Sequence, residues 1–314
     1  MKKLLLSAAS TMTLICTSAA AADLDPTKSS NAPVTQDNWL GVYAGLNAGA
    51  AWGNSNSINF MGVPGYALPI TLPGRTAPNI NYSIANASAG FGNIPMGNAV
   101  NFIGGAQVGY NWRFLEKGIF SLETDFQGLA GQKSGNTTIL SAVNVLNNNN
   151  NAYSIGQMYG NASLDYFGTV RGRLGYKILS STLLYATAGF AYGGVSLNAS
   201  TRSDLFTSSP DLRTNNHTGA DTSSGVNVGW TAGAGAEWMF MPNWSAKAEY
   251  LYYDLGSTII RTDTMARIRY IDNQPSQLLF VSDFFAKANF NGNIARLGVN
   301  YHFSSSPTSM VSKF

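Results

Sequence analysis

Segments in which every second residue is apolar recur along most of the chain. The segment ARLGVNYHF, residues 295–303, is apolar at each odd position and carries Arg296, Asn300 and His302 in between. Successive side chains of a β-strand point to opposite faces, so this alternation predicts a strand with one apolar face. It does not show which face meets water, because a soluble sandwich buries its apolar face whereas a membrane barrel turns that face toward lipid.

Eight segments with this pattern are predicted to be strands. Many have ten residues or more, whereas ordinary strands have about 5–6 residues and a tilted strand needs about 9–11 residues to cross a bilayer. Their length therefore favours membrane-spanning strands over the strands of a soluble sandwich. The predicted strands cover residues 40–52, 102–113, 120–127, 164–177, 184–192, 227–238, 244–250 and 295–303.

The connections between these segments alternate strictly between short and long. Three are short turns, at residues 115–118, 179–181 and 241–243, and four are long. Outer-membrane barrels have short periplasmic turns and longer extracellular loops, so the alternation predicts an all-β fold, an eight-stranded antiparallel transmembrane β-barrel with both termini in the periplasm. The four long connections, rich in Asn, Ser, Thr and Gly, are predicted to be extracellular loops at residues 53–98, 131–160, 199–224 and 256–285.

Composition supports a membrane barrel. Charged residues make up only 11% of the chain, against about 25% in ordinary soluble domains, yet the mean hydropathy is close to zero, at -0.03. Beyond the N-terminal segment no apolar stretch approaches the length of a membrane helix, so only a closed barrel could satisfy its backbone in lipid. Aromatic residues near the predicted strand ends are expected to form two interfacial girdles: Trp39, Trp52, Trp112, Tyr176, Trp238, Trp244, Tyr301 and Phe303.

The N-terminal segment is predicted to be a cleaved secretory signal peptide. Two lysines precede an apolar stretch that runs to Cys16, and an A-x-A site ends at Ala22. Cys16 is the only cysteine, so the mature chain would have no thiol or disulfide. Loss of the two lysines leaves 17 of the 19 basic residues against 16 acidic ones, a balance that argues against a nucleic-acid partner. The predicted parts are residues 1–22 (signal peptide), 23–38 (periplasmic lead-in), 39–303 (barrel) and 304–314 (short periplasmic tail).

Charged residues of the predicted strands fall on the face opposite to the apolar one. An Arg or Lys at the lipid midplane costs about 2–4 kcal/mol, so the charged face is expected to line the lumen. An eight-stranded barrel is just wide enough for its interior to be filled by side chains. We therefore expect a lumenal network of ion pairs and hydrogen bonds, with a structural role rather than one in selective transport. Its expected members are Arg113, Glu123, Asp125, Asp165, Arg171, Arg173, Lys177, Glu237, Lys247, Glu249 and Arg296.

Six strand segments also carry a family resemblance. They read WLGVYAGLNAGAAWG, FIGGAQVGYNW, LDYFGTVRGRLGY, LLYATAGFAYG, WSAKAEYLYYDLG and NIARLGVNYHF. With them the chain resembles the small opacity-like outer-membrane porin family of alphaproteobacteria, which includes major surface antigens and hemin-binding proteins. The resemblance covers the strands and implies a location in the outer membrane of a Gram-negative bacterium. The long connections contain no recognisable motif.

The resemblance also implies a role for the alternation at the end of the chain. The last strand of such proteins carries the signal that the outer-membrane assembly machinery reads, a terminal aromatic residue preceded by apolar residues at alternating positions. Leu297, Val299, Tyr301 and Phe303 match this signal. Family members usually end on the aromatic residue, whereas here SSSPTSMVSKF follows.

Few residues could carry catalysis or hold a metal or a cofactor. No Ser-His-acid set can be placed from the sequence, so we expect no enzymatic activity, and two distant histidines without cysteine form a poor metal site. His302 is expected to be a lumenal hydrogen-bonding residue. His217, in the third long connection, is the candidate axial ligand if heme is bound, as the hemin-binding relatives imply; a solvated loop histidine is the alternative. We expect no resident cofactor.

Three functions remain open at this point. A structural surface protein or porin, with its barrel filled or narrowly open, needs only the barrel. A heme-binding or host-adhesion receptor would act through the long loops, and an outer-membrane enzyme lacks an evident nucleophile and base. The expected partners are outer-membrane lipid and the assembly machinery, with heme or host surface molecules under the second function.

Overall fold

The computed structural model describes one continuous folded unit of the chain. The chain divides into two compact units, residues 1–36 and 37–314, and all described residues belong to the second. The predicted signal peptide, the tail and the lead-in apart from residue 38 lie outside the described residues, so these boundaries stay predictions. The described residues, some by their backbone alone, are 38–54, 57–65, 91–95, 100–131, 139–147, 150–207, 217–271 and 274–303.

Every regular element of these ranges is a β-strand. No helix among them is long and apolar enough to cross a membrane. The strands are β1 (Gly41–Gly53), β2 (Ser57–Gly65), β3 (Gly92–Pro95), β4 (Val100–Arg113), β5 (Gly118–Ala130), β6 (Ile139–Asn147), β7 (Asn150–Leu179), β8 (Thr182–Thr207), β9 (His217–Met241), β10 (Trp244–Ile271) and β11 (Gln274–His302).

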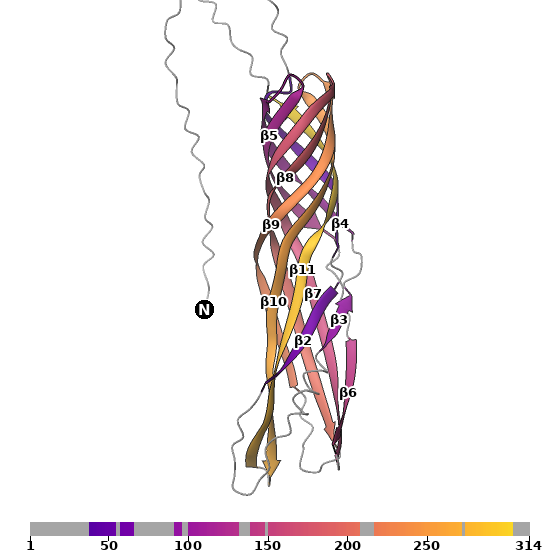
Figure 1. Cartoon of the computed structure of the whole chain (residues 1–314), viewed down its shortest axis with the longest axis vertical. Helices are drawn as coiled ribbons and strands as arrows, with labels where there is room; N and C mark the ends of the chain where they lie inside the picture. Colours follow the sequence, from indigo (N-terminus) through magenta and orange to yellow (C-terminus); the bar gives the residue numbers. More distant parts are fainter. Residues whose placement is uncertain are drawn as a thin grey trace, which may run out of the picture. The chain divides into compact units, whose positions relative to one another are not determined.

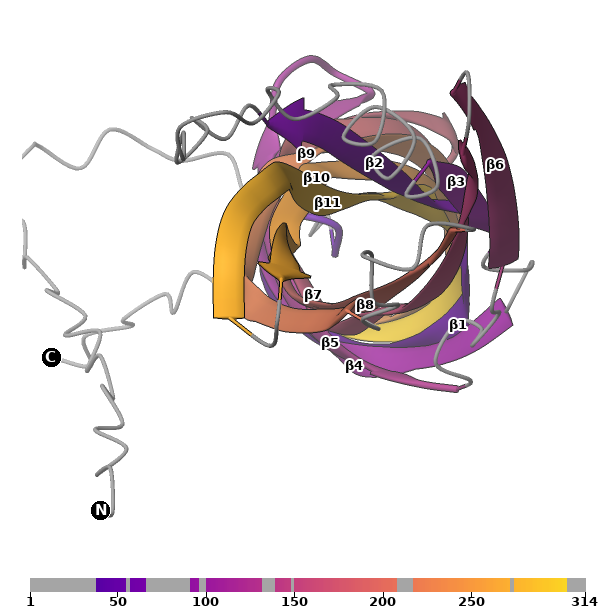
Figure 2. The ribbon, with the colours of Figure 1, turned by 90° about the horizontal axis from the view of Figure 1, so that it is seen from below.

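Eight of the strands close into one antiparallel ring. The order around the ring is β1-β4-β5-β7-β8-β9-β10-β11, and β11 pairs back with β1. Figure 2, which looks along the ring, shows these strands around a common axis. Each of the eight predicted strands is one of the eight in the ring, so the predicted barrel is confirmed.

Three tight turns lie at one end of the ring, which we call the turn end. Residues 114–117 join β4 to β5, residues 180–181 join β7 to β8, and residues 242–243 join β9 to β10. Asn243 has a φ of 70°, the left-handed conformation that asparagine tolerates and that a two-residue hairpin turn requires. The predicted short turns are confirmed.

The long connections are found where predicted, but much of their length is strand rather than irregular loop. β7 has 30 residues, β10 has 28 and β11 has 29, about three times the length needed to cross a bilayer. Only residues 272–273 separate β10 from β11, and β2, β3 and β6 add strands inside the first two long connections. We call the strand parts beyond the ring the extension: β2, β3, β6 and residues 150–164, 193–207, 217–229, 255–271 and 274–291.

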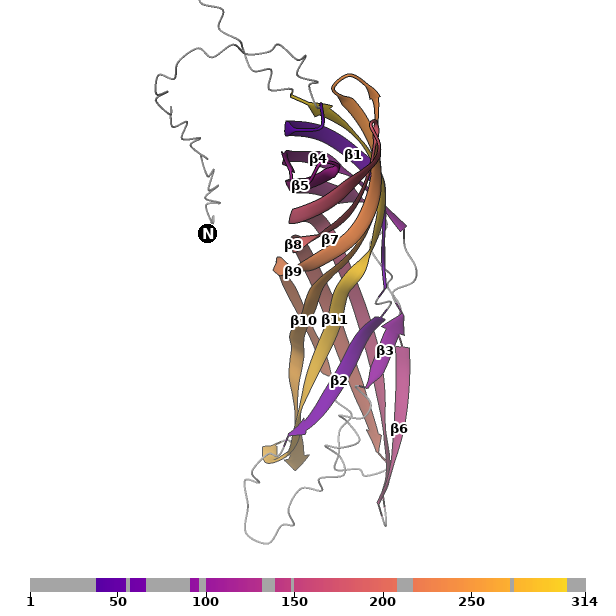
Figure 3. The same cartoon turned by 45° about the horizontal axis from the view of Figure 1, so that its top comes forward.

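The wall of the ring opens between β9 and β10 where the extension begins. The β9–β10 ladder ends at the pair Trp230–Asp254, although β9 continues along β8 to His217 and β10 continues along β11 to Ile271. Two four-stranded sheets follow, β6-β7-β8-β9 and β10-β11-β2-β3. Figures 1 and 3 show β2 and β3 beside β11, and β6 beside β7.

The two sheets of the extension pack face to face. The hydroxyl oxygens of Thr201 on β8 and Thr262 on β10 lie 3.0 Å apart, although these strands are not neighbours in either sheet. Gly160 on β7 lies against β2, where a Cβ atom would be 2.7 Å from Cδ1 of Ile58. The extension is therefore a small β-sandwich that continues the strands of the ring.

Two irregularities mark the passage from ring to extension. The register of β7 against β8 shifts at Asp165, and the register of β10 against β11 shifts near Gly256, which has a φ of 73°. An extra residue exchanges the inward and outward positions of a strand. On β7 the inward side chains are accordingly odd-numbered in the ring, as Arg171 is, and even-numbered in the extension, as Met158 is.

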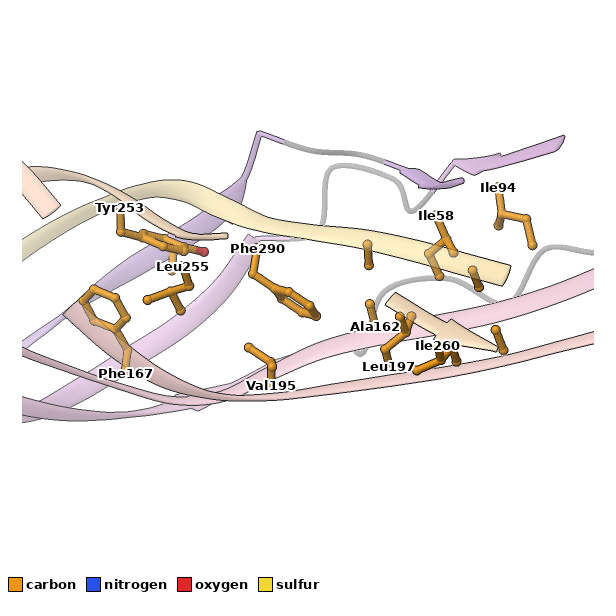
Figure 4. Packing of buried hydrophobic residues seen from close by; sticks show 14 of the residues in the cluster. Ile58, Ile94, Ala162, Phe167, Val195, Leu197, Tyr253, Leu255, Ile260 and Phe290 are labelled. Atoms are coloured by element: carbon orange, nitrogen blue, oxygen red, sulfur yellow. The ribbon is translucent and has the colours of Figure 1, made fainter. Parts of the chain in front are cut away.

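Apolar side chains fill the extension and the adjoining part of the ring. Figure 4 shows Val195 and Leu197 of β8 on one side of this core and Phe290 of β11 on the other. The main cluster continues inward to Leu251 and Ile294, which lie inside the ring itself. The predicted polar lumen is therefore only partly correct, since the lumen turns from polar to apolar on the way to the extension.

Candidate functional site

Around the ring the burial pattern of a soluble protein is reversed. Large apolar side chains of the outward face are exposed, with 69% for Leu46 and 68% for Leu297, whereas the polar inward side chains of Gln107 and Glu123 are buried. So much contiguous apolar surface would make a protein associate in water. The outward face of the ring thus has the chemistry of a lipid-facing surface.

Aromatic side chains form two bands on this outward face. Near the turn end Trp244 packs against Tyr301, with ring centroids 5.1 Å apart, and at the other end Trp230 packs against Tyr252 at 5.3 Å. Trp230 and Trp238 on β9 are eight residues apart. At about 3.3 Å per residue and a tilt of about 40°, they are separated by about 20 Å along the barrel axis. This spacing is close to the apolar band of an outer-membrane barrel.

The predicted girdle position of Trp39 is wrong. Trp39 is 2% exposed and lies inside the turn end of the ring, where its indole Nε1 donates a hydrogen bond to the carbonyl oxygen of Ser180 at 3.0 Å. It belongs to a small apolar cluster with Ile119, Leu183 and Tyr185. Trp39 precedes β1, so it is not bound to the alternation of that strand and can turn into the mouth of the ring.

A buried group of charged side chains crosses the ring on the side of Trp39 away from the turn end. We call it the charge cluster, and all its members are at most 4% exposed. It contains four acids and four bases, so its formal charges balance when all are ionised. They come from five ring strands: Glu123 and Asp125 (β5), Arg171 and Arg173 (β7), Glu237 (β9), Lys247 and Glu249 (β10) and Arg296 (β11).

Glu123 is the centre of the charge cluster. Its carboxylate accepts hydrogen bonds from Nη1 of Arg173 at 2.9 Å and from Nζ of Lys247 at 3.1 Å, and it also pairs with Arg171. The hydroxyl of Tyr43 donates to the same carboxylate at 2.8 Å. Burial of a carboxylate is costly unless it is paired and hydrogen-bonded, and Glu123 is both.

A second set of contacts links the far side of the charge cluster. Arg171 donates to Asp125 at 2.9 Å and to Glu249 at 3.0 Å, and Arg296 donates to Asp125 at 2.8 Å and to Glu249 at 2.7 Å. Each of these two arginines therefore bridges two strands on opposite sides of the lumen. The contacts tie β5, β7, β10 and β11 together across the barrel.

Glu237 connects the charge cluster to a neutral polar layer. Its carboxylate accepts from Arg173 at 2.7 Å, from the amide of Asn300 at 2.7 Å and from the hydroxyl of Ser245 at 2.6 Å. His302 is fully buried beside it, with Nε2 2.9 Å from Oγ of Ser245. The expected lumenal hydrogen-bonding role of His302 is confirmed.

Ser245, His302 and Glu237 do not have the geometry of a catalytic triad. In a triad the serine and the acid contact opposite nitrogens of the histidine. Here both Ser245 and Glu237 contact Nε2, at 2.9 Å and 3.4 Å. Among the described residues no group of three or more His, Cys, Asp or Glu side chains could hold a metal ion.

Three predicted members of the lumenal network lie outside the charge cluster. Arg113 and Asp165 are exposed, and Lys177 is only half-buried. Arg113 is the last residue of β4 and Lys177 is near the end of β7, so both reach the rim. Asp165 sits at the irregularity of β7, which turns its side chain outward. Strand parity ceases to predict the lumen at strand ends and bulges, so the network role of these three residues stays a prediction.

The neutral partners of the charges were not predicted from the sequence. Tyr185 lies on the inward face of β8, and the guanidinium of Arg173 is 3.8 Å from the centroid of its ring. Gln107 donates to Asn300 at 2.6 Å and accepts from Asn47 at 2.7 Å. All of these residues lie at positions whose place in the strand alternation predicts an inward side chain, so the alternation could have indicated them.

The other predicted site residues remain untested in their roles. Leu297, Val299, Tyr301 and Phe303 all lie on the outward face or at the end of β11, as an assembly signal of alternating residues requires. His217 begins β9 rather than lying in a loop, and its side chain lies outside the described residues, so its role as a heme ligand stays a prediction.

Comparison with known proteins agrees with the ring and its outward face. Residues 7–303 match the family described as outer membrane protein beta-barrel domain. The 31 kDa outer-membrane immunogenic proteins of Brucella melitensis and Brucella suis are each 31% identical to the chain over 300 residues, which cover 94% of this chain and 98% of theirs.

More distant similarities are weaker. The 25 kDa outer-membrane immunogenic protein of Brucella abortus is 34% identical over 101 residues, 30% of this chain and 38% of that protein. The crystal structure of Neisserial surface protein A aligns over 83% of this chain and 97% of that one, at 12% identity and a TM-score of 0.30. The resemblance to a family of small outer-membrane surface antigens is confirmed by the two full-length relatives. Since the family match spans nearly the whole sequence, the chain belongs to the outer membrane protein beta-barrel family, as an outer-membrane surface antigen whose ring spans the bilayer.

Proposed function

We propose that this protein is a closed, non-conducting barrel that anchors a rigid extracellular β-sandwich. It acts at the cell surface by binding other molecules on the sandwich. The observation that carries the proposal is the burial of the charge cluster. Side chains that line a water-filled pore keep surface that water can touch. The eight members of the charge cluster are at most 4% exposed to solvent.

The layers on either side of the charge cluster support a closed lumen. On the periplasmic side lie Trp39, Ile119, Leu183 and Tyr185, all at most 4% exposed. On the extracellular side the apolar core begins inside the ring and runs on into the extension. Each layer alone is a barrier to ions, because an apolar constriction does not hold a continuous column of water.

A narrow porin is the less favoured alternative. An open pore would require the charge cluster to separate, and removal of one partner from a buried ion pair costs about 3–5 kcal/mol. Glu123 alone pairs with four cations, so any opening would break several pairs at once. We also propose that the protein is not an enzyme, which the contacts of Ser245 and Glu237 with the same nitrogen of His302 support.

Single-channel conductance of the refolded protein in a planar bilayer tests the proposal. We expect no discrete openings from the wild type, with folding checked by resistance to SDS before heating. A conducting porin measured in the same bilayers is the positive control, which shows that a leak would be detected. The double variant Glu123→Ala with Arg171→Ala should also stay silent, because the apolar layers on both sides of the charge cluster remain. Reproducible openings of the folded wild type would refute the closed barrel.

A further inference from the structure

The opening between β9 and β10 leaves each of these strands with one long edge that no strand of the described residues pairs. Beyond the last β9–β10 pair, Trp230–Asp254, β9 continues to His217 with β8 on one side only. Among the described residues no strand pairs with its other side. The side-chain amide of Asn227 makes the last link across the opening, as its Nδ2 donates to the carbonyl oxygen of Leu255 at 3.2 Å.

Much of this part of β9 is exposed on both faces, although Gly219 is buried. Thr218, Ala220, Thr222 and Ser224 are exposed on one face, and Asp221 is exposed on the other. The core of the sandwich lies behind β8, where Leu197 and Ala199 are buried, and β9 stands beside it as an outer strand. Side chains would therefore not block the approach of another chain to the edge.

The edge also lacks the features with which proteins usually protect such strands. Exposed edges commonly carry lysines, prolines or bulges, or are covered by another element. Residues 218–229 contain no Lys, Arg or Pro, and Asp221 is their one charged residue. No register shift interrupts the β8–β9 pairing along this stretch.

We propose that the edge of β9 from Thr218 to Gly225 binds an extended peptide segment of a partner protein as an added antiparallel strand. Apart from the N–H of Thr222, which donates to Oδ1 of Asp221 at 2.8 Å, the backbone N–H and C=O groups along this edge face no partner strand among the described residues and are chemically complementary to another extended backbone. Asp221 favours a partner segment with a basic residue at the opposing position, since opposite charges across two strands attract. The inference rests on the proposed function only in that the extension must face the outside of the cell.

The β9 edge of a second copy is a poor occupant for geometric reasons. Copies in one membrane point the same way, so a two-fold axis along the membrane normal would bring their β9 edges together in parallel. In a parallel pair, bonded residues are offset by one along the strands, which a symmetric pair cannot satisfy. A free peptide segment has no such restriction and can approach antiparallel to β9.

The test selects binders from a phage-displayed library of random peptides, each long enough to form a strand of about ten residues, on the wild-type protein in lipid nanodiscs. Selected peptides are then titrated against Thr222→Pro and Ser223→Pro, with Thr222→Ala and Ser223→Ala as matched controls. Neighbouring residues of a strand point their N–H groups to opposite sides, so one of the two proline variants blocks the free edge while the other disturbs the β8–β9 ladder.

The expected result separates backbone binding from side-chain binding. One folded proline variant should lose peptide affinity by about tenfold or more, because it loses an N–H donor and gains a steric clash, while both alanine variants stay within about twofold. Hydrogen exchange of the wild type, which needs no variant to fold, should show that bound peptide slows exchange of the amides of residues 218–225.

Three outcomes of the peptide experiments would overturn the inference. They are the absence of any enriched peptide, an equal loss of affinity in the alanine and proline variants, and peptide binding without protection of residues 218–225. Disulfide-linked dimers of a Ser224→Cys variant that form in the membrane would also overturn it, since the edge would then serve a second copy. None of these results alters the conductance of the wild type, so failure here is distinguishable from failure of the closed barrel.

Discussion

The ring and the extension are built from the same strands but have opposite cross-sections. In the ring the outward face is apolar, as at Leu46, and the inward face holds the charge cluster. In the extension the inward face is apolar, as at Phe60 and Leu197, and charged pairs such as Arg261–Asp283 lie outside. The exchange occurs within single continuous strands, at the irregularities of β7 and β10.

In both regions the surroundings dictate the outer face, whereas the interior has only to be filled. Lipid surrounds the ring and water surrounds the extension, so the outer faces differ. Inside, the barrel excludes water with paired charges and the sandwich does so with apolar side chains. The first solution depends on every charge keeping its partner, and the second depends on volume and contact.

Removal of Glu123 should have the largest effect. Glu123→Ala leaves Arg171, Arg173 and Lys247 buried without their common partner. We expect a loss of about 3–5 kcal/mol in the free energy of unfolding, measured by urea titration of the refolded protein in lipid vesicles. Asp165→Ala, at an exposed position of β7, is the control and should change it by less than about 0.5 kcal/mol. Equal effects of the two variants would show that the charge cluster does not hold the barrel together.

Truncation of a core side chain in the sandwich should destabilise the extension nearly as much, but should leave the ring intact. Phe60 is 3% exposed inside the extension, and a buried Phe→Ala change costs about 3–5 kcal/mol. Phe60→Ala should make the extension sensitive to proteases while the ring keeps its resistance to SDS. Met61→Ala changes the neighbouring residue on the outer face, which is 45% exposed, and should have little effect. Loss of the ring in Phe60→Ala would mean that the two regions are one cooperative unit.

The same arginine substitution on the two outer faces should have different outcomes. Leu46→Arg places a charge in lipid and should cost about 2–4 kcal/mol near the bilayer midplane. Met61→Arg places it in water and should change stability by less than about 0.5 kcal/mol. Urea titration of both variants compares them directly. A neutral Leu46→Arg variant would contradict the assignment of the outward face of the ring to lipid.

The smallest effect is expected for an ion pair on the outside of the extension. The side chains of Arg261 and Asp283 are 52% and 34% exposed, and such pairs contribute about 0–1 kcal/mol. Asp283→Asn should therefore change the free energy of unfolding far less than Glu123→Ala, although both remove one carboxylate charge. The effect of Asp283→Asn should shrink further in high salt, since exposed pairs are screened.

The ring could be predicted almost fully from the sequence because its two faces meet contrasting surroundings. Leucines and aromatics alternate there with charges and amides, and strand parity placed Glu123, Arg171 and Arg296 correctly in the lumen. Trp39 could not be placed this way, because it lies outside the strands and its partner is a backbone carbonyl of a distant turn.

The extension could not be recognised from the sequence, because apolar and polar positions differ little there and bulges shift their alternation. The stretch VSLNAS on β8 alternates as a strand should, with Val195, Leu197 and Ala199 buried, but its polar partners are the small residues typical of loops. The bulges at Asp165 and Gly256 exchange the two faces in mid-strand, so no single pattern runs the full length of β7 or β10. Pairing of β2 with β11 joins residues far apart in the chain, which local patterns cannot show.

A disulfide between β8 and β10 would show whether the barrel wall opens into a packed sandwich. The hydroxyls of Thr201 and Thr262 are 3.0 Å apart across the sandwich, so cysteines there should be near bonding geometry. Once the predicted signal peptide has been removed, the chain has no other cysteine. We predict that Thr201→Cys with Thr262→Cys crosslinks on mild oxidation of the folded protein, whereas each single variant does not. A folded double variant that stays reduced would mean that β8 and β10 stay apart, as in a barrel that continues unchanged above the membrane.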